Sequence, residues 1–288
     1  MSNATIQNDY VRETLAGNFP ECPCGAPRLA PHTIGKRGTW CHAHDRMQRW
    51  VLGHGPMPFN VFVKGNHKLP FYALSALPVF TCPGAGECAT FCYSFKAWRY
   101  PGAFMRQLGV TLLLRSAAGR EIIRAAWHAL PADHDVRLFV DGDVENRRTL
   151  EFIFQLCNER PDLRAYGYSK SWSIFLAHAD SGGAWPSNYV LNLSSGSIYG
   201  PAMRERMESL PIVRGQFLAM HSETKMPDRR THPEAFNAYA AALRATAREA
   251  GHAKVFACPG KCGDCMGNGA HACGTHAMNG VAVLIGIH

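Results

Sequence analysis

The chain has 288 residues, of which 47% are hydrophobic, and a formal net charge of +8 at pH 7. This length and this hydrophobic content suffice for a large core, as one α/β domain with an appendage or as two domains, and exclude a disordered chain. No apolar run approaches the roughly 20 residues of a membrane span, and the N-terminus lacks the apolar segment of a secretory signal. We therefore expect a cytoplasmic protein with no membrane partner. The positive charge favours an anionic partner, either nucleic acid or a phosphorylated small molecule.

The first feature along the chain is a set of metal-ligand types in residues 22–44. Cys22 and Cys24 are followed, after a short glycine-containing stretch, by Cys41 and His44. Two ligand pairs separated by a hairpin-like stretch are typical of a small structural zinc site. The alternative is a surface loop in which these side chains are neighbours by chance. We assign residues 1–60 to an N-terminal segment with this zinc-like module, and residues 61–288 to an α/β domain.

The next feature is a C-x5-C-x3-C pattern in TCPGAGECATFCYS, which we call the cysteine loop (residues 82–92). Its thiols are Cys82, Cys88 and Cys92, with Gly and Pro between the first two. Thiolates this close together are ligands of a soft metal centre, so zinc and an iron–sulfur cluster are the two candidates. Disulfide bonding, the alternative, requires an oxidising compartment.

Strands alternating with helices are predicted after the cysteine loop. Helices are predicted at 103–130 (two helices, broken near 118–119), 147–160, 171–179, 201–210 and 232–251, and strands at 136–140, 163–168, 188–193, 216–220 and 254–257. Cys157 falls on the apolar stripe of a helix and is interpreted as a small buried hydrophobe. The alternation predicts an α/β fold, either a partial (β/α) barrel or an open parallel sheet, with Cys-rich metal-binding loops and the small N-terminal zinc-like module.

A second set of thiols follows the last predicted strand, and we call it the C-terminal cysteine group. It consists of Cys258, Cys262, Cys265 and Cys273 in CPGKCGDCMGNGAHAC. Four ligands make a closed site, which is either a second iron–sulfur cluster or structural zinc.

Polar residues stand at the carboxyl end of every predicted strand, where barrels and parallel sheets assemble their sites. They are Asp141, Asp143, Ser169, Lys170, Ser194, Ser195, His221, Ser222 and Cys258. Asp141 and Asp143 are candidates to bind a cation or a substrate's hydroxyl or amino groups, although Asp143 could equally cap the next helix. Lys170 is a candidate to hold a carboxylate or phosphate. We expect Ser194 and His221 to contact a cofactor.

Three stretches carry a resemblance to a known family. LPFYALSALPVFTCPGAGECATFCYSFKAW resembles the signature of the gene product 88 type of phage and plasmid proteins. VRLFVDGDVENRRTLEFIFQLCNERPDLRAYGYSKSW and CPGKCGDC…VAVLIGIH are similar to later blocks of the same proteins. The similarity covers residues 65–288 in scattered motifs and implies no function. The layout, a three-cysteine loop before a run of βα units, is similar to that of radical S-adenosylmethionine enzymes, although C-x5-C-x3-C replaces their C-x3-C-x2-C.

The likeness to radical enzymes implies a 4Fe–4S cluster on the cysteine loop. Three cysteines leave one iron of the cubane open, and that iron can chelate S-adenosylmethionine. The C-terminal cysteine group would hold a second cluster or zinc. Since Cys258, Cys262 and Cys265 have the radical-enzyme spacing themselves, the two roles could be reversed, or both groups could converge on one metal.

Two functional hypotheses follow from these patterns. In the first, the chain is an iron–sulfur enzyme that cleaves S-adenosylmethionine reductively, or does related redox chemistry, on a small-molecule or nucleic-acid substrate with the help of an electron donor. In the second, every metal site holds Zn²⁺, and the basic chain is a nucleic-acid-binding or regulatory protein of a mobile element. The βα series and the open cysteine loop favour the first, while the charge and the N-terminal segment favour the second.

Overall fold

The computed structural model describes residues 3–20, 40–65, 69–90, 92–263, 265–266 and 271–287. Its helices are α1 (Asn3–Leu15), α2 (Trp40–Val51), α3 (Pro101–Arg115), α4 (Ala117–His128), α5 (Arg147–Glu159), α6 (Trp172–Asp180), α7 (Pro201–Glu208) and α8 (Pro233–Glu249). Short 3-10 turns are η2 (Glu87–Ala89), η3 (Tyr93–Arg99), η4 (Ala272–Gly274) and η5 (His276–Met278). The strands are β1 (Val63–Lys64), β2 (Tyr72–Ala73), β3 (Asp135–Leu138), β4 (Arg164–Ser169), β5 (Tyr189–Ser194), β6 (Val213–His221), β7 (Val255–Ala257) and β8 (Ala282–Ile287).

Within the described residues the strands form one open, mostly parallel sheet. Its order is β1-β2-β3-β4-β5-β6-β8-β7, so the strands are added side by side in chain order as far as β6. The pair β1–β2 is antiparallel and every other neighbouring pair is parallel. The prediction of an α/β fold with an open parallel sheet is therefore confirmed.

The helices and strands predicted between residues 103 and 257 are all present. The break between α3 and α4 lies at Ser116, slightly before the predicted position, because the Ser116 hydroxyl caps α4 by accepting a hydrogen bond from the Gly119 amide at 3.0 Å. Strand β8 was not predicted, and it enters the sheet between β6 and β7. None of the helices in the described part of the chain is long and apolar enough to span a membrane.

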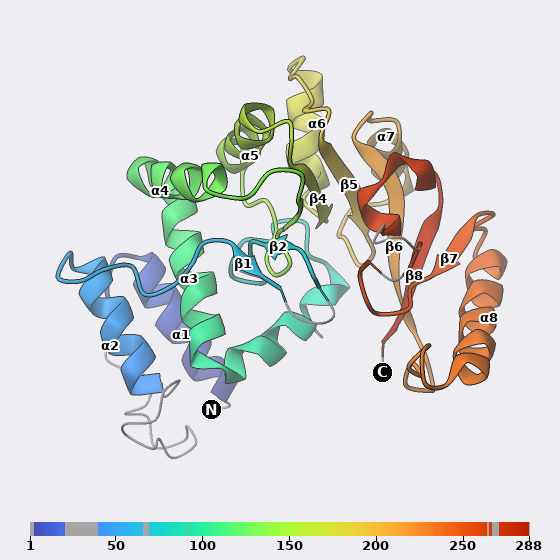
Figure 1. Ribbon diagram of the computed structural model, residues 1–288, viewed down its shortest axis with the longest axis horizontal. Coiled ribbons are helices and arrows are strands. Elements are labelled where there is room, and N and C mark those ends of the chain that lie inside the picture. Colours follow the sequence, from blue (N-terminus) through green and yellow to red (C-terminus); the bar gives the residue numbers. More distant parts are fainter. Residues whose placement is uncertain are drawn as a thin grey trace.

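One face of the sheet packs against helices. Ala165 of β4 and Leu191 of β5 lie in the largest apolar cluster with residues of α4, α5, α6 and α7. Helix α8 packs against β7 and β8 through Phe236 and Leu243. Figure 1 shows these helices following one another around the outside of the strands. The opposite, inner face of the sheet is therefore left to loops.

The C-terminal loops occupy that inner face. Tyr166 of β4 and Val190 of β5, which alternate with the helix-facing residues, pack against Ala272 and Cys273 of η4. In Figure 1 the dark red turns that precede β8 lie beside β6. The C-terminal cysteine group is thus placed against the middle of the sheet.

The N-terminal helices pack at the other end of the molecule. Tyr10 of α1, Met47 of α2 and Phe104 of α3 are all buried in one apolar cluster, to which Trp98 of η3 also belongs. A boundary between two domains near residue 60 stays a prediction. In the structure, residues on both sides of that position contribute to this one apolar cluster.

Candidate functional site

The cysteine loop lies across the carboxyl ends of β4 and β5. The Gly86 amide donates to the carbonyl of Gly196 at 3.0 Å, and the amide of Ile198 donates to the carbonyl of Gly84 at 3.1 Å. At Gly84 a Cβ atom would lie 1.7 Å from the carbonyl oxygen of Lys170, so this position requires glycine. The loop is therefore packed directly on the ends of β4 and β5.

Asp143 fixes the base of the cysteine loop. Its Oδ2 accepts a hydrogen bond from the amide of Lys170 at 2.7 Å, and its Oδ1 accepts one from Val144 at 2.7 Å. The Asp143 amide in turn donates to Thr81 Oγ1 at 3.1 Å, directly before Cys82. Burial raises the pKa of the Asp143 carboxyl, while these donors favour its ionised form. The carboxylate thus joins the ends of β3 and β4 to the loop.

Helix capping, the alternative role for Asp143, is not what the structure shows. Helix α5 is capped by Asn146, whose Oδ1 accepts a hydrogen bond from the amide of Thr149 at 2.9 Å. Asp143 lies before Asn146, the N-cap residue of α5, and so does not cap that helix.

Lys170 reaches the cysteine loop from the end of β4. Its Nζ donates a hydrogen bond to Ser194 Oγ at 2.8 Å, which joins β4 to the end of β5. The ammonium group lowers the pKa of both Cys82 and Cys88, against the larger and opposite effect of burial. Lys170 is thus bonded to Ser194, and its charge acts on two of the loop thiols, Cys82 and Cys88.

The thiols of the cysteine loop form a donor set for a soft metal. Cys82, Cys88 and Cys92 are partly buried and form no disulfide. Burial raises the pKa of Cys82 and Cys88, and the nearby Cys92 raises both further. Without a cation the Cys82 and Cys88 thiols stay protonated at neutral pH; a bound metal would supply the positive charge that makes them thiolates. The chemistry of this donor set fits a metal centre.

Asp141 lies on the side of the loop that follows Cys92. Its Oδ2 accepts a hydrogen bond from Gln107 Nε2 at 2.9 Å, and Gln107 Oε1 accepts one from Trp98 Nε1 at 2.8 Å. Tyr93, which is 61% exposed, donates its hydroxyl to the carbonyl of Val140 at 3.1 Å. The carboxylate of Asp141 is thus held in place, and among the described residues no hydrogen bond engages its Oδ1.

His221 is the predicted site residue that lies apart from this group. It is exposed at the end of β6, farther along the strand than Phe217, the residue that pairs with Ser194. The neighbouring serine, Ser195, uses its hydroxyl to accept a hydrogen bond from Ala219 at 2.9 Å. A contact between His221 and a cofactor stays a prediction.

The C-terminal cysteine group is gathered on the inner face of the sheet. All four thiols lie in the apolar cluster with Phe71 and Tyr166. Burial, with the neighbouring thiols of the group, raises the pKa of Cys258 to about 12, and burial raises that of Cys273 to about 11. Two backbone amides point at sulfur: Gly260 donates to Cys258 Sγ at 3.4 Å and Ala272 to Cys265 Sγ at 3.2 Å. Such N–H···S hydrogen bonds tune metal–thiolate centres.

Two arginines that the sequence analysis missed border this group. Arg214, 1% exposed, donates from Nε to Asn192 Oδ1 at 2.7 Å, and Asn192 Nδ2 donates to the carbonyl of Cys273 at 2.8 Å. Arg137 lies with its guanidinium 4.5 Å from the ring centre of Tyr168, and its charge favours the thiolate of Cys262. A charged residue inside an apolar strand, as in VRLFV, is the signal that could have pointed to Arg137.

The N-terminal zinc-like module is described only in part. Cys41 and His44 both lie in α2, and His44 is buried with Nδ1 at 2.8 Å from the hydroxyl of Tyr10. Cys22 and Cys24 lie outside the described residues. Zinc binding by these four side chains stays a prediction.

Among the described residues, no three His, Cys, Asp or Glu side chains are already arranged to hold one metal ion. The two cysteine groups are therefore sets of neighbouring thiols, and their identity as metal-binding loops stays a prediction.

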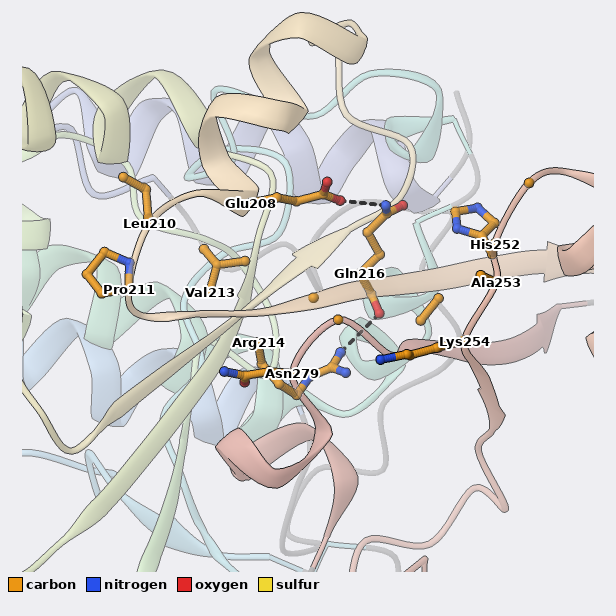
Figure 2. A pocket seen from close by; sticks show the side chains of 14 residues that line it. Glu208, Leu210, Pro211, Val213, Arg214, Gln216, His252, Ala253, Lys254 and Asn279 are labelled. Atoms are coloured by element: carbon orange, nitrogen blue, oxygen red, sulfur yellow. Dashed lines mark hydrogen bonds between the residues drawn. The ribbon is translucent and has the colours of Figure 1, made fainter.

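Two cavities adjoin the sheet. One of about 160 Å³ lies beside the strand-end site and is lined by Trp172, Ser194 and Tyr199. A larger one, of about 600 Å³, lies at the opposite edge of the sheet, where β6, β7 and β8 begin, and Arg214, Gln216 and Lys254 line it. Figure 2 shows Gln216 in this cavity, hydrogen-bonded to Glu208 and Arg214. The smaller cavity is the one adjacent to the cysteine loop.

The fold and this site define a class of α/β protein in which two cysteine groups lie on a mostly parallel sheet. A family model described as gene product 88 matches residues 54–276, and the chain therefore belongs to the gene product 88 family. The resemblance seen in the sequence is thereby confirmed as far as the family. No curated protein and no solved structure matches the chain.

Proposed function

We propose that the protein is an iron–sulfur enzyme that binds a 4Fe–4S cluster on its cysteine loop and does radical S-adenosylmethionine-like or related redox chemistry. The observation that carries the proposal is the position of the loop. It has three thiols, it lies across the carboxyl ends of β4 and β5, and the charge of Lys170 acts on Cys82 and Cys88 there. Parallel sheets bind their ligands at that edge.

The polar groups beside the loop suit the amino-acid end of S-adenosylmethionine. The Lys170 ammonium, held by Ser194, offers a charged donor to a carboxylate, and Asp141 offers an acceptor to an amino group. The ring of exposed Tyr93 offers a surface on which an adenine can stack. When bound and reduced by an electron donor, the cluster supplies the electron for cleaving the cofactor.

The C-terminal cysteine group suits a closed centre, an auxiliary cluster or structural zinc. Four thiolates around such a centre leave it with a net negative charge, which is costly to bury without cations. The positive charge of Arg214 interacts with Cys273 and that of Arg137 with Cys262, so each arginine would offset part of that negative charge.

The net charge of +8 supports a second candidate, a zinc protein that binds nucleic acid. In that case both cysteine groups would hold Zn²⁺ and the exposed arginines would contact phosphates. Its affinity for DNA or RNA would fall steeply as salt is raised.

Anaerobic purification followed by iron, sulfide and zinc analysis tests the two candidates against each other. Iron with equimolar sulfide and a broad visible absorption supports the first; colourless protein with stoichiometric zinc refutes it and supports the second. Cys82→Ala should remove the part of the iron bound to the cysteine loop. Cys157→Ala is the matched control, because that thiol belongs to α5 and is buried in the apolar core. Iron and sulfide that Cys82→Ala leaves unchanged would remove Cys82 from the ligands.

A further inference from the structure

Arg137 stands out because its charge has no acidic partner in the part of the chain that the structure describes. Its strand neighbours Val136 and Leu138 pack into the helix-side core, so Arg137 lies on the inner face of the sheet. Among the described residues no hydrogen bond or ion pair holds its guanidinium, and its Nε is buried without a partner. The contact that it does make is with the ring of Tyr168. A guanidinium with a buried Nε normally faces an anion, because removing part of a charged group from water without a partner is costly.

The groups around Arg137 do not supply a full negative charge. Its neighbour across the strands is Tyr166 and its guanidinium lies over the ring of Tyr168, and neither side chain carries a carboxylate. Cys262 can be a thiolate when it binds a metal. One sulfur, however, can accept hydrogen bonds from only some of the five N–H groups of a guanidinium. The remaining donors are available to another anionic group.

Two further polar atoms beside Arg137 lack a nitrogen or oxygen partner. Within the described part of the chain, His271 Nδ1 is buried and unbonded, and the buried Tyr166 hydroxyl has no nitrogen or oxygen partner, its neighbour being the Cys262 thiol. These residues are 5% and 1% exposed. Their rings lie 4.4 Å apart between centres, and the charge of Arg137 acts on both of them. Buried polar groups without partners are rare, so their concentration at one place indicates a ligand.

We propose that Arg137 and the Tyr166 hydroxyl bind the carboxylate or phosphate group of a small-molecule substrate on the inner face of the sheet, beside Cys262. The planar guanidinium matches either group with two parallel hydrogen bonds, and the hydroxyl adds a third donor. Arg137 is only partly buried, so its outer donors can be reached by a ligand. The inference rests on the proposed function, because it names the class of molecule on which the iron–sulfur protein would act.

Calorimetric titration of the anaerobically purified full chain with inorganic phosphate, and separately with acetate, tests this inference at constant ionic strength. We expect saturable binding of one anion per chain. Binding of phosphate alone would assign a phosphorylated substrate, and binding of acetate alone a carboxylic acid. Binding of neither anion overturns the inference.

Variants locate the binding. Arg137→Met should weaken it by about tenfold or more, because it removes charge-assisted hydrogen bonds, and Tyr166→Phe by about fivefold. Tyr166→Phe keeps the ring and thus covers the case in which Arg137→Met fails to fold. The control Arg147→Met, an exposed arginine paired with Glu151 on α5, should bind as the unaltered protein does. Equal affinity in Arg137→Met and the unaltered protein overturns the inference.

Iron and sulfide contents of the same preparations separate this inference from the proposed function. Protein without iron that still binds the anion through Arg137 would support the anion site and refute the iron–sulfur assignment. Arg137→Met that loses iron but binds the anion normally would show that Arg137 serves the thiolates alone, which overturns the anion site and leaves the iron–sulfur assignment standing.

Discussion

The two cysteine groups differ in what surrounds them. The cysteine loop lies at the edge of the sheet, where its neighbours are the charged and polar side chains of Asp143, Lys170 and Ser194. The C-terminal cysteine group lies against the middle of the sheet among aromatic rings. The first has three thiols and polar groups that remain able to bind a ligand; the second has four thiols in an apolar setting. This difference suits one centre that reacts and one that holds the structure together.

The largest expected effect tests the structural role of the C-terminal cysteine group. Cys273→Ala should lower the free energy of unfolding by about 3 kcal/mol or more, because metal binding at a closed site contributes directly to folding. Cys157→Ala, which removes another buried thiol, should cost only about 1 kcal/mol. Denaturant titration of the metal-loaded proteins measures both. Equal losses in the two variants would mean that no metal stabilises this group.

The next effect concerns the connection between the cysteine loop and the sheet. In Asp143→Asn an NH₂ group replaces one carboxylate oxygen. That oxygen accepts a hydrogen bond from the backbone amide of Lys170 or Val144, and the NH₂ group cannot accept one. We expect a loss of about 2 kcal/mol in unfolding free energy, because a buried amide then lacks its acceptor.

The metal content of this variant sharpens the comparison between the groups. Asp143→Asn should lower the metal bound by the cysteine loop and leave the C-terminal cysteine group loaded, since the latter does not depend on Asp143 for its position. Equal loss of metal from both groups would instead indicate one shared centre. Elemental analysis of the purified variant, with Cys82→Ala as the reference for an empty loop, gives the answer.

Much of this arrangement follows from local sequence patterns. The strands and helices between residues 103 and 257 have clear periodicity, so the carboxyl edge of the sheet and its polar groups could be predicted. Strand β8 could not, because its apolar run VAVLIGI has no alternation and its place between β6 and β7 depends on distant pairing. Arg137 and Tyr166 are neighbours through the register of β3 and β4, whereas His271 joins them only when the C-terminal loops fold onto the inner face. No sequence motif or residue spacing predicts that contact.

A smaller effect tests how closely the cysteine loop is packed on β4. Gly84→Ala places a methyl group against the carbonyl oxygen of Lys170, so the loop must shift, at a cost of about 2 kcal/mol. Gly102→Ala is the control. Apart from the adjacent residues and the backbone of its own helix, no atom lies within 4 Å of a Cβ at that position, so an alanine near the start of α3 should be neutral or slightly stabilising. Thermal denaturation compares the two. A neutral Gly84→Ala would contradict the contact between loop and strand.

The smallest effect on stability separates ligand binding at the cysteine loop from its structure. Lys170 is partly exposed and its hydrogen bond to Ser194 is a local one, so Lys170→Met should change the free energy of unfolding by less than about 0.5 kcal/mol. If the ammonium holds the carboxylate of S-adenosylmethionine, the same variant should weaken binding of that molecule about tenfold in equilibrium dialysis. Lys225→Met, at an exposed position in the loop after β6, serves as the control and should not alter binding. Undiminished binding by Lys170→Met, with the cluster intact, would place the cofactor elsewhere and make the C-terminal cysteine group, with Arg137 beside it, the better candidate for the reacting centre.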